Sequence, residues 1–375
     1  VNNITKGFEY SDGWVDDARL VVLNAVAAQE KGATIKTQTQ CIKAIRQNDI
    51  WLITLENNLT GETYQVKSKS VVNASGPWVA ELFSQAMALK SPQNVRLIKG
   101  SHIVVPRIHE DPEAYMLQNI DQRIIFVIPF EDDFSLIGTT DVEFTGEPSE
   151  VKISEEEIQY LLKITNKYFK NKISRDDIVT TYSGVRPLLD DESVDAQSVT
   201  RDYTLALEDI NDKAPILSIF GGKITTYRKL SEAAVDKLIP YFKTIGPQWT
   251  AKSPIPGGNF DDIKVFTEEV ENKYPWLPQK LRARFIRSYG TRIFSLLKNS
   301  THMAALGRSY GADLFEQEIN FLIEQEWATD INDIIWRRTK RGLYLTTQEV
   351  NEITRYIKTH PTIIAKKTPE FVNVA

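Results

Sequence analysis

The chain contains the segment Ser218-Ile219-Phe220-Gly221-Gly222-Lys223-Ile224-Thr225-Thr226-Tyr227-Arg228-Lys229, in which an apolar run ends on two glycines and a helical pattern follows at once. This order predicts a strand, a tight turn and a helix. Glycines let the backbone approach a flat or anionic ligand because no Cβ stands in the way, and a helix start offers free N–H groups to negative charge. An ordinary strand-to-helix turn explains the same pattern equally well.

A second segment of this strand-turn-helix kind lies earlier, at residues 70–79 (Ser-Val-Val-Asn-Ala-Ser-Gly-Pro-Trp-Val). The turn between strand and helix is called an elbow in both segments. Its apolar run stops on the small residues Asn73, Ala74, Ser75 and Gly76, and Pro77 suits the first turn of the helix that follows. Both elbows therefore place a loop of small residues directly after a strand.

Residues 95–144 form a β-rich block in which apolar and polar residues alternate, most clearly at 101–105 and 123–128. The pattern predicts an antiparallel sheet. His102 lies within it. A histidine on a strand is more often a hydrogen-bonded structural residue than a catalyst, yet imidazole is the side chain best suited to exchange a proton near neutral pH.

Periodicity and turn residues divide the rest of the chain into short strands and helices. Strands are predicted at 33–37, 41–46, 50–56, 63–66, 178–185 and 203–206, and helices at 14–32, 155–169 and 226–241. From about residue 261 the pattern is mainly helical, with helices predicted at 261–274, 280–289, 314–326 and 331–341. The last part of the chain is therefore expected to form a separate helical domain.

Composition excludes several classes of protein. The net charge of −5 over 375 residues, without a long basic stripe, argues against nucleic acid as a partner. Cys41 is the single cysteine, which excludes an intrachain disulfide and a cysteine zinc site and fits the reducing cytoplasm. Apolar runs such as residues 124–130 are far shorter than the roughly 20 residues of a membrane-spanning helix. Neither metal-ligand spacing nor a hydrolase nucleophile motif is present.

Arginines could supply an anion site. Arg186 and Arg201 are candidates for binding a phosphate or carboxylate, because a guanidinium group binds such groups through two parallel hydrogen bonds. Most arginines are solvated or lie in surface ion pairs, and the pattern does not separate these two from Arg107 and Arg123. A basic cluster at residues 337–341 could contact an anionic membrane surface, but acidic residues between 324 and 333 fit an ion-paired helix end equally well.

Longer strings resemble the bacterial aerobic, FAD-linked glycerol-3-phosphate dehydrogenases, in that family's order. They are Gly-Phe-Glu-Tyr-Ser-Asp (7–12), Trp-Val-Asp-Asp-Ala-Arg-Leu (14–20), Arg-Leu-Ile-Lys-Gly-Ser-His-Ile-Val-Val-Pro-Arg (96–107), Ile-Gly-Thr-Thr-Asp (137–141), Tyr-Ser-Gly-Val-Arg-Pro-Leu (182–188) and the segment 220–229. The resemblance covers nearly the whole chain, and several distinctive strings in order are far more specific than one glycine motif.

The resemblance implies an α/β flavoprotein with a Rossmann-like FAD-binding domain, an antiparallel-sheet substrate domain of amino-acid-oxidase type and a C-terminal all-α domain. In this chain the FAD-binding domain would take residues 19–84 and 188–245. The substrate-binding domain would take residues 1–18 and 85–187, and the helical domain residues 250–375.

The resemblance also implies the chemistry: hydride transfer from C2 of sn-glycerol 3-phosphate to N5 of FAD, which yields dihydroxyacetone phosphate, with electrons passed to a membrane quinone. The protein would attach peripherally to the cytoplasmic face of the membrane, and a homo-oligomer is compatible with the sequence. Arg186 and Arg201 would bind the phosphate, while His102 and Lys223 would lie at the reacting hydroxyl. FAD would contact Gly221, Gly222, Lys223, Thr225 and Thr226 at its isoalloxazine, Asn73, Ala74, Ser75 and Gly76 at the other elbow, and Cys41 near its adenine.

One departure from the family is large. The Gly-x-Gly-x-x-Gly turn that seats the FAD pyrophosphate does not occur in these 375 residues, and we expect it to lie upstream of Val1, together with a further arginine for the substrate phosphate. Two alternatives follow. One is a related FAD-dependent amine or amino-acid oxidase, which needs a clamp for a carboxylate. The other is a cofactor-free interaction module.

We expect the 375-residue chain by itself to bind FAD weakly or not at all and to be inactive, because its glycines reach only the flavin end of the cofactor. The ultraviolet-visible spectrum of the purified chain measures FAD content. A yellow protein that releases stoichiometric FAD on denaturation would contradict this expectation.

Overall fold

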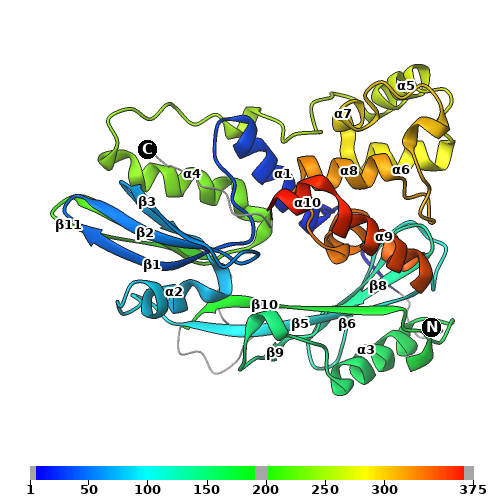
Figure 1. Ribbon diagram of the computed structural model, residues 1–375. Coiled ribbons are helices and arrows are strands. Elements are labelled where there is room, and N and C mark those ends of the chain that lie inside the picture. The colour runs from blue at the N-terminus through cyan, green and yellow to red at the C-terminus, as the bar shows by residue number, and fades with distance from the viewer. Residues whose placement is uncertain (1–5, 191–201, 367–375) are drawn as a thin grey trace. The chain divides into compact units, whose positions relative to one another are not determined.

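The computed structural model describes residues 6–190 and 202–366 (Figure 1). The chain divides into two compact units. The first takes the described parts of Val1–Ser11, Cys41–Leu55 and Gln65–Pro247, and the second takes those of Asp12–Gln40, Glu56–Tyr64 and Gln248–Ala375. Each unit is therefore assembled from segments that lie far apart in the sequence.

The first unit contains a six-stranded sheet in the order β10-β5-β8-β7-β6, with β9 also paired to β5. The strands are β5 (Val95–Pro106), β6 (Tyr115–Gln118), β7 (Ile124–Phe130), β8 (Phe134–Gly138), β9 (Val142–Glu143) and β10 (Thr180–Leu189). All these pairs are antiparallel. The antiparallel sheet predicted within residues 95–144 is confirmed, and β10 adds the strand that carries Arg186.

Alternation along β5 makes the two faces of this sheet different. Ile103 and Val105 are fully buried in an apolar core with residues of helix α3 (Glu155–Tyr168), among them Leu161. Successive side chains of a strand point to opposite faces. His102 therefore lies on the face that α3 does not cover.

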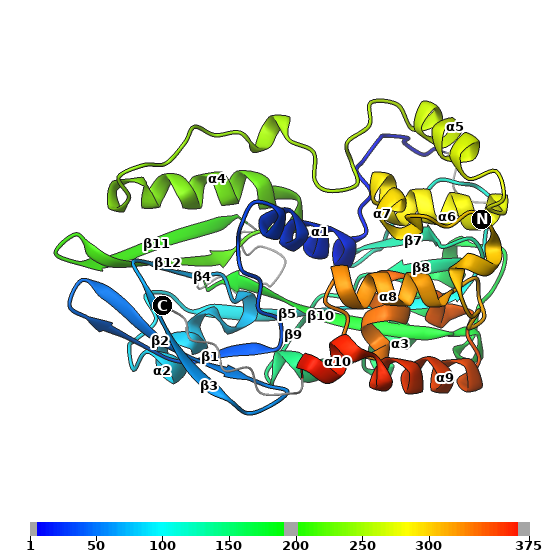
Figure 2. The ribbon, with the colours of Figure 1, turned by 45° about the horizontal axis from the view of Figure 1, so that its top comes forward.

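A three-stranded sheet in the order β11-β12-β4 carries the two elbows. Strand β12 (Lys213–Gly221) pairs in parallel with β4 (Val71–Asn73) and antiparallel with β11 (Tyr203–Ile210). Helix α2 (Val79–Ala86) packs on one face of β12, and α4 (Tyr227–Leu238) packs on the other, where Figure 2 shows it running along the strands. Helices on both faces of a sheet with parallel strands are typical of a doubly wound α/β domain.

The strands predicted at 41–46, 50–56 and 63–66 form as β1 (Thr39–Gln47), β2 (Ile50–Asn57) and β3 (Thr63–Ser68), which pair in sequence order as a meander. Trp51 ties it to β12, since its buried indole N–H donates to the carbonyl of Ala214 at 2.9 Å. The strand predicted at residues 33–37 is wrong. These residues form a loop that leads into β1, with no partner strand beside them in the described part of the chain.

The second unit is mainly helical. Helix α1 (Asp17–Glu30) begins after Asp16, whose side chain accepts from the backbone N–H of Arg19, so Asp16 caps the helix. The later helices are α5 (Ile263–Lys273), α6 (Gln279–Tyr289), α7 (Ile293–Leu297), α8 (Glu316–Gln325), α9 (Thr347–Thr359) and α10 (Pro361–Lys366). The helix predicted at 331–341 forms as a π-helical turn at Asp333–Arg338 and a short 3₁₀ turn. Across residues 6–190 and 202–366, none of the helices has the length and apolar composition needed to cross a bilayer.

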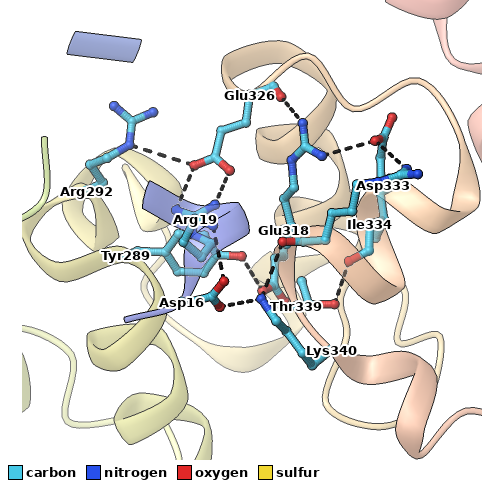
Figure 3. Close-up of polar contacts among 12 residues, drawn as sticks. Asp16, Arg19, Tyr289, Arg292, Glu318, Glu326, Asp333, Ile334, Thr339 and Lys340 are labelled. Atoms are coloured by element: carbon cyan, nitrogen blue, oxygen red, sulfur yellow. Dashed lines mark hydrogen bonds and ion pairs between the residues drawn. The ribbon is translucent and has the colours of Figure 1, made fainter. Parts of the chain in front are cut away.

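Buried ion pairs connect α1 to the later helices of this unit (Figure 3). Arg19 pairs with Glu326, and both side chains are almost fully buried. Arg284 binds Glu318 through two contacts of 2.7 Å, and the Tyr289 hydroxyl donates to the same carboxylate at 2.6 Å. Burial and then the Glu318 charge raise the pKa of Tyr289 well above its usual value, so the phenol stays protonated and donates.

The basic cluster at residues 337–341 belongs to this network of charges. Arg338 is buried and binds Asp333 at 3.1 Å, while Lys340 pairs with Asp16 (Figure 3). Arg337 is exposed, yet it also binds Asp333, at 3.0 Å. These contacts fit the ion-paired alternative and do not support a membrane contact through this cluster.

Replacement of Glu318 should destabilise the protein strongly. Glu318→Gln keeps the shape of the side chain but leaves the buried guanidinium of Arg284 without its counter-charge, so we expect the free energy of unfolding to fall by about 3–5 kcal/mol. Arg308→Ala breaks an exposed pair with Glu352 and should lower it by less than about 1 kcal/mol. Urea unfolding followed by tryptophan fluorescence compares the two variants, and equal losses would contradict the prediction.

Candidate active site

The face of the six-stranded sheet opposite α3 brings together side chains predicted for catalysis. In the register of β5 and β10, Tyr182 lies opposite His102 and Gly184 lies opposite Gly100. Arg186 follows Gly184 by two residues, so its side chain leaves β10 on the same face. His102 and Arg186, which are distant in sequence, therefore share one surface of one sheet.

His102 lies flat against this face. Its ring stacks on Tyr182 with the centroids 4.7 Å apart, and it covers Gly138 so closely that a Cβ there would come within 2.3 Å of the ring. Its Nδ1 atom is buried and has no hydrogen-bond partner among the described residues. Burial, and secondarily the charge of Arg186, lower the pKa of His102 to about 4. The imidazole is therefore neutral near pH 7 and able to accept a proton.

The loop after β8 orients Arg186. Nη1 of Arg186 binds the Asp141 carboxylate at 2.6 Å, and Nη2 donates to Thr139 Oγ1 at 3.4 Å. Gly100 leaves room for the guanidinium, since a Cβ at that position would lie 2.9 Å from Nη2. The side chain of Arg186 is 35% exposed. A guanidinium has five N–H donors, so donors remain for an anion such as a phosphate.

The parallel strands β4 and β12 end at one edge of their sheet, because Asn73 lies opposite Ser218. Asn73 is buried and shapes the elbow: its Nδ2 donates to the carbonyl of Val79 at 2.9 Å, and its Oδ1 accepts from the Ser75 hydroxyl at 2.6 Å. Gly76 continues the turn with a φ of 58°. Ligands of α/β sheets bind beyond the carboxyl ends of the strands, which is where this loop lies.

The elbow after β12 requires both of its glycines. The φ angles are 72° at Gly221 and 98° at Gly222, and a Cβ on Gly221 would come within 2.8 Å of the backbone carbonyl of Asp202. Lys223 and Thr225 are exposed, and α4 starts soon after them. A backbone bare of Cβ atoms, a lysine and a helix N-terminus fit the isoalloxazine end of FAD, which gains negative charge on reduction.

Two of the other predicted site residues lie in the two elbows, and Cys41 lies outside them. Thr226 closes the turn, with its Oγ1 donating to the Lys223 carbonyl at 2.9 Å, and Ala74 is exposed in the first elbow. Cys41 is half-buried on β1, and burial raises the pKa of its thiol. Arg201 lies outside the described residues. In the described part of the chain, no group of His, Cys, Asp or Glu side chains could hold a metal ion.

Sequence reasoning did not single out Asp141, Thr139 or Tyr182 as parts of the site. Each of them lies in one of the strings that carry the family resemblance, so the signal was present in the sequence. Their relation to His102 and Arg186 depends on how β5, β8 and β10 pair, and a single sequence does not show that register.

Comparisons with known proteins identify the family of the chain. Residues 1–228 match the family model "FAD dependent oxidoreductase", and residues 248–360 match "C-terminal domain of alpha-glycerophosphate oxidase". The aerobic glycerol-3-phosphate dehydrogenase of Escherichia coli (strain K12) is 49% identical over 94% of this chain and 71% of its own length. The glycerol-3-phosphate dehydrogenase of Pseudomonas aeruginosa is 48% identical over 96% of this chain and 70% of its own length. The D-erythritol 1-phosphate dehydrogenase of Brucella abortus is 44% identical over 93% of this chain and 70% of its own length.

A solved structure shows the same fold. The glycerol-3-phosphate dehydrogenase from Bacillus halodurans complexed with FAD has a TM-score of 0.75 at 24% identity and covers 95% of this chain and 74% of its own. The predicted fold class is confirmed: an FAD-dependent oxidoreductase fold of the α/β type, with an antiparallel substrate sheet and a C-terminal helical domain. By its family models and by the identities of its relatives, the chain belongs to the family of FAD-dependent, aerobic glycerol-3-phosphate dehydrogenases.

Proposed function

We propose that this protein oxidises sn-glycerol 3-phosphate to dihydroxyacetone phosphate, with FAD as the hydride acceptor and a membrane quinone as the next electron acceptor. Family membership supports FAD-dependent oxidation of a polyol phosphate. The observation that carries the proposal is the placement of a neutral imidazole and a partly exposed guanidinium on one face of one sheet. A proton acceptor and an anion site are what oxidation of a phosphorylated alcohol requires.

The proposed roles follow from these two groups. Arg186 binds the phosphate through the N–H groups that Asp141 does not occupy, and Arg201 is proposed as a second phosphate ligand. His102 accepts the proton of the C2 hydroxyl while the hydrogen on C2 leaves with its electron pair, so that C2 becomes a carbonyl carbon. Lys223 stabilises negative charge on the reacting oxygen. FAD, when bound, supplies the acceptor for that hydride at N5.

The proposed FAD contacts follow the two elbows. Gly221, Gly222, Thr225 and Thr226 would face the isoalloxazine, the loop 73–76 would line the adjoining edge, and Cys41 would approach the adenine through its backbone. The domain division remains part of the proposal, with residues 19–84 and 188–245 in the FAD-binding domain, 1–18 and 85–187 in the substrate-binding domain, and 250–375 in the helical domain.

The similarity to a D-erythritol 1-phosphate dehydrogenase favours that polyol phosphate as the second candidate substrate. Erythritol 1-phosphate also carries a phosphate ester and secondary hydroxyls, so Arg186 and His102 could serve either substrate. The ratio of the two kcat/KM values decides between them, because it reports differential binding of the two transition states.

The quinone part of the proposal places the protein on the cytoplasmic face of the membrane as a peripheral protein, because quinones are dissolved in the bilayer. The ion-paired residues 337–341 are not proposed as the contact. Flotation of the holoenzyme with anionic liposomes at low and high salt tests attachment. Absence of flotation at every salt concentration would count against it.

Removal of the Arg186 guanidinium should weaken substrate binding. We expect Arg186→Ala in the holoenzyme to raise KM for glycerol 3-phosphate about tenfold or more, because a charge-assisted bidentate contact contributes on the order of 2 kcal/mol. Glycerol, which has no phosphate, should be less affected. Arg175→Ala serves as the control, since Arg175 is exposed and pairs with Glu155. If Arg186→Ala leaves the kinetics with glycerol 3-phosphate unchanged, another residue binds the phosphate, and Arg201 is the next candidate.

The low pKa of His102 should appear in the pH dependence of stability. Its folded pKa of about 4 lies below the ordinary 6.5, so between these values the unfolded state binds more protons and the free energy of unfolding falls as the pH falls. His102→Gln removes this contribution and should flatten the decrease between pH 6.5 and 4, measured by urea unfolding. His302→Gln, which replaces an exposed imidazole, is the control. If His102→Gln and wild type lose stability equally over this range, the prediction is wrong.

A further inference from the structure

A polar cluster lies under the active-site face, on the side of the sheet that α3 covers. Its centre is Glu157 in the first turn of α3, which is 5% exposed. Oε1 of Glu157 accepts from the hydroxyls of Thr140 at 2.6 Å and Ser101 at 2.9 Å. Oε2 accepts from the backbone N–H of Ser154 at 2.8 Å and lies 2.7 Å from Nζ of Lys99. Four donors therefore converge on one buried carboxylate.

This carboxylate is ionised at neutral pH. Burial by itself would raise the pKa of Glu157, but the hydrogen bonds from Lys99, Thr140, Ser154 and Ser101 together outweigh burial and lower it. Hydrogen bonds to a charged acceptor are stronger than those between neutral groups, and they are stronger still away from water. Thr140 is therefore held firmly on the α3 side of the sheet, where its own exposed fraction is 1%.

The loop that contains Thr140 also orients Arg186, from the other face. Thr139 and Asp141 flank Thr140, and their side chains bind the guanidinium of Arg186. The backbone N–H of Ser101 donates to Thr140 Oγ1 at 3.0 Å, so β5 holds the same hydroxyl. Thr140 thus joins a carboxylate buried beneath the sheet to a guanidinium on the face above it.

We propose that Glu157 is a positioning residue for Arg186, acting through Thr140 and Asp141, and this inference rests on the proposed role of Arg186 in binding the substrate phosphate. Arginine has a long side chain with many rotamers. Its planar guanidinium group must be aligned with the phosphate to bind it through two hydrogen bonds. An Asp141 carboxylate held in one place selects one orientation of the guanidinium before substrate arrives. Substrate binding then costs less conformational entropy, because this side chain is already ordered in the free enzyme.

Thr140→Val tests the connection, because it removes the hydroxyl and keeps the shape of the side chain. In the holoenzyme we expect KM for glycerol 3-phosphate to rise on the order of three- to tenfold, with kcat changed by less than about twofold, since phosphate binding is weakened and the hydride step is not. Thr140→Ser restores the hydroxyl and should retain the wild-type KM. Asp141→Asn changes a partly exposed side chain and should raise KM at least as much, so the inference stays testable if Thr140→Val folds poorly.

Asn166→Ala is the matched structural control. It removes the two hydrogen bonds of 2.8 Å between Asn166, near the end of α3, and the backbone of Ile173, and it leaves Glu157 and Thr140 untouched. We expect lower thermal stability with an unchanged KM. A second readout is independent of turnover: the rise in Tm on adding glycerol 3-phosphate should shrink in Thr140→Val and Asp141→Asn but not in Asn166→Ala.

A double-mutant cycle separates this inference from the proposed function. In an Arg186→Ala background, Thr140→Val should raise KM no further, because both act on one interaction. If Arg186→Ala raises KM while Thr140→Val and Asp141→Asn leave it unchanged, the inference is overturned and the phosphate role of Arg186 stands. The inference is also overturned if Thr140→Val raises KM by the same factor in the wild-type and in the Arg186→Ala background. An unchanged KM in Arg186→Ala removes the proposed phosphate role and this inference with it.

Discussion

The candidate active-site face depends on the pairing of strand β5 with β8 and β10. These ladders bring His102, Gly138 and Tyr182 into one row, and they place Arg186 on the same surface. Because successive side chains of a β-strand point to opposite faces, alternate residues of β5 lie on opposite sides of the sheet. Apolar residues and the partners of Glu157 face α3, while the imidazole and the guanidinium lie on the other face. A shift of one residue would exchange these two sets, so the packing of α3 also selects the register of the site.

Small residues serve different purposes at the two parts of the site. Gly100 and Gly138 lie in strands, where they leave room for the side chains of Arg186 and His102 to lie flat on the sheet. Gly221 and Gly222 lie in a turn, where their positive φ angles exclude most other residue types. The backbone of this turn carries no Cβ atoms and lies at the end of the sheet. The first arrangement suits a small polar substrate, and the second suits the close approach of a flat cofactor.

The helical unit uses charge in another way. Two of its arginine–carboxylate pairs, Arg19–Glu326 and Arg284–Glu318, are almost fully buried. The first connects α1 to a residue 307 positions further along the chain. A basic cluster at residues 337–341 looks like a surface feature in the sequence, because charged residues are usually solvated. The fold buries part of that cluster against carboxylates, and sequence spacing alone does not reveal those partners.

The sequence by itself determined the family and most of the longer elements, although it predicted a strand at residues 33–37 where the chain forms a loop. Alternating residues predicted the antiparallel block, glycine and proline marked both elbows, and ordered strings around His102, Arg186 and Lys223 identified the relatives. These signals are local, since each depends on neighbouring residues. Only the tertiary structure decided that Asp141 binds Arg186, 45 residues away, and that Glu157 lies beneath both. Such contacts depend on strand register and on which face of α3 is buried, and the free energy that selects them comes from packing the whole sheet.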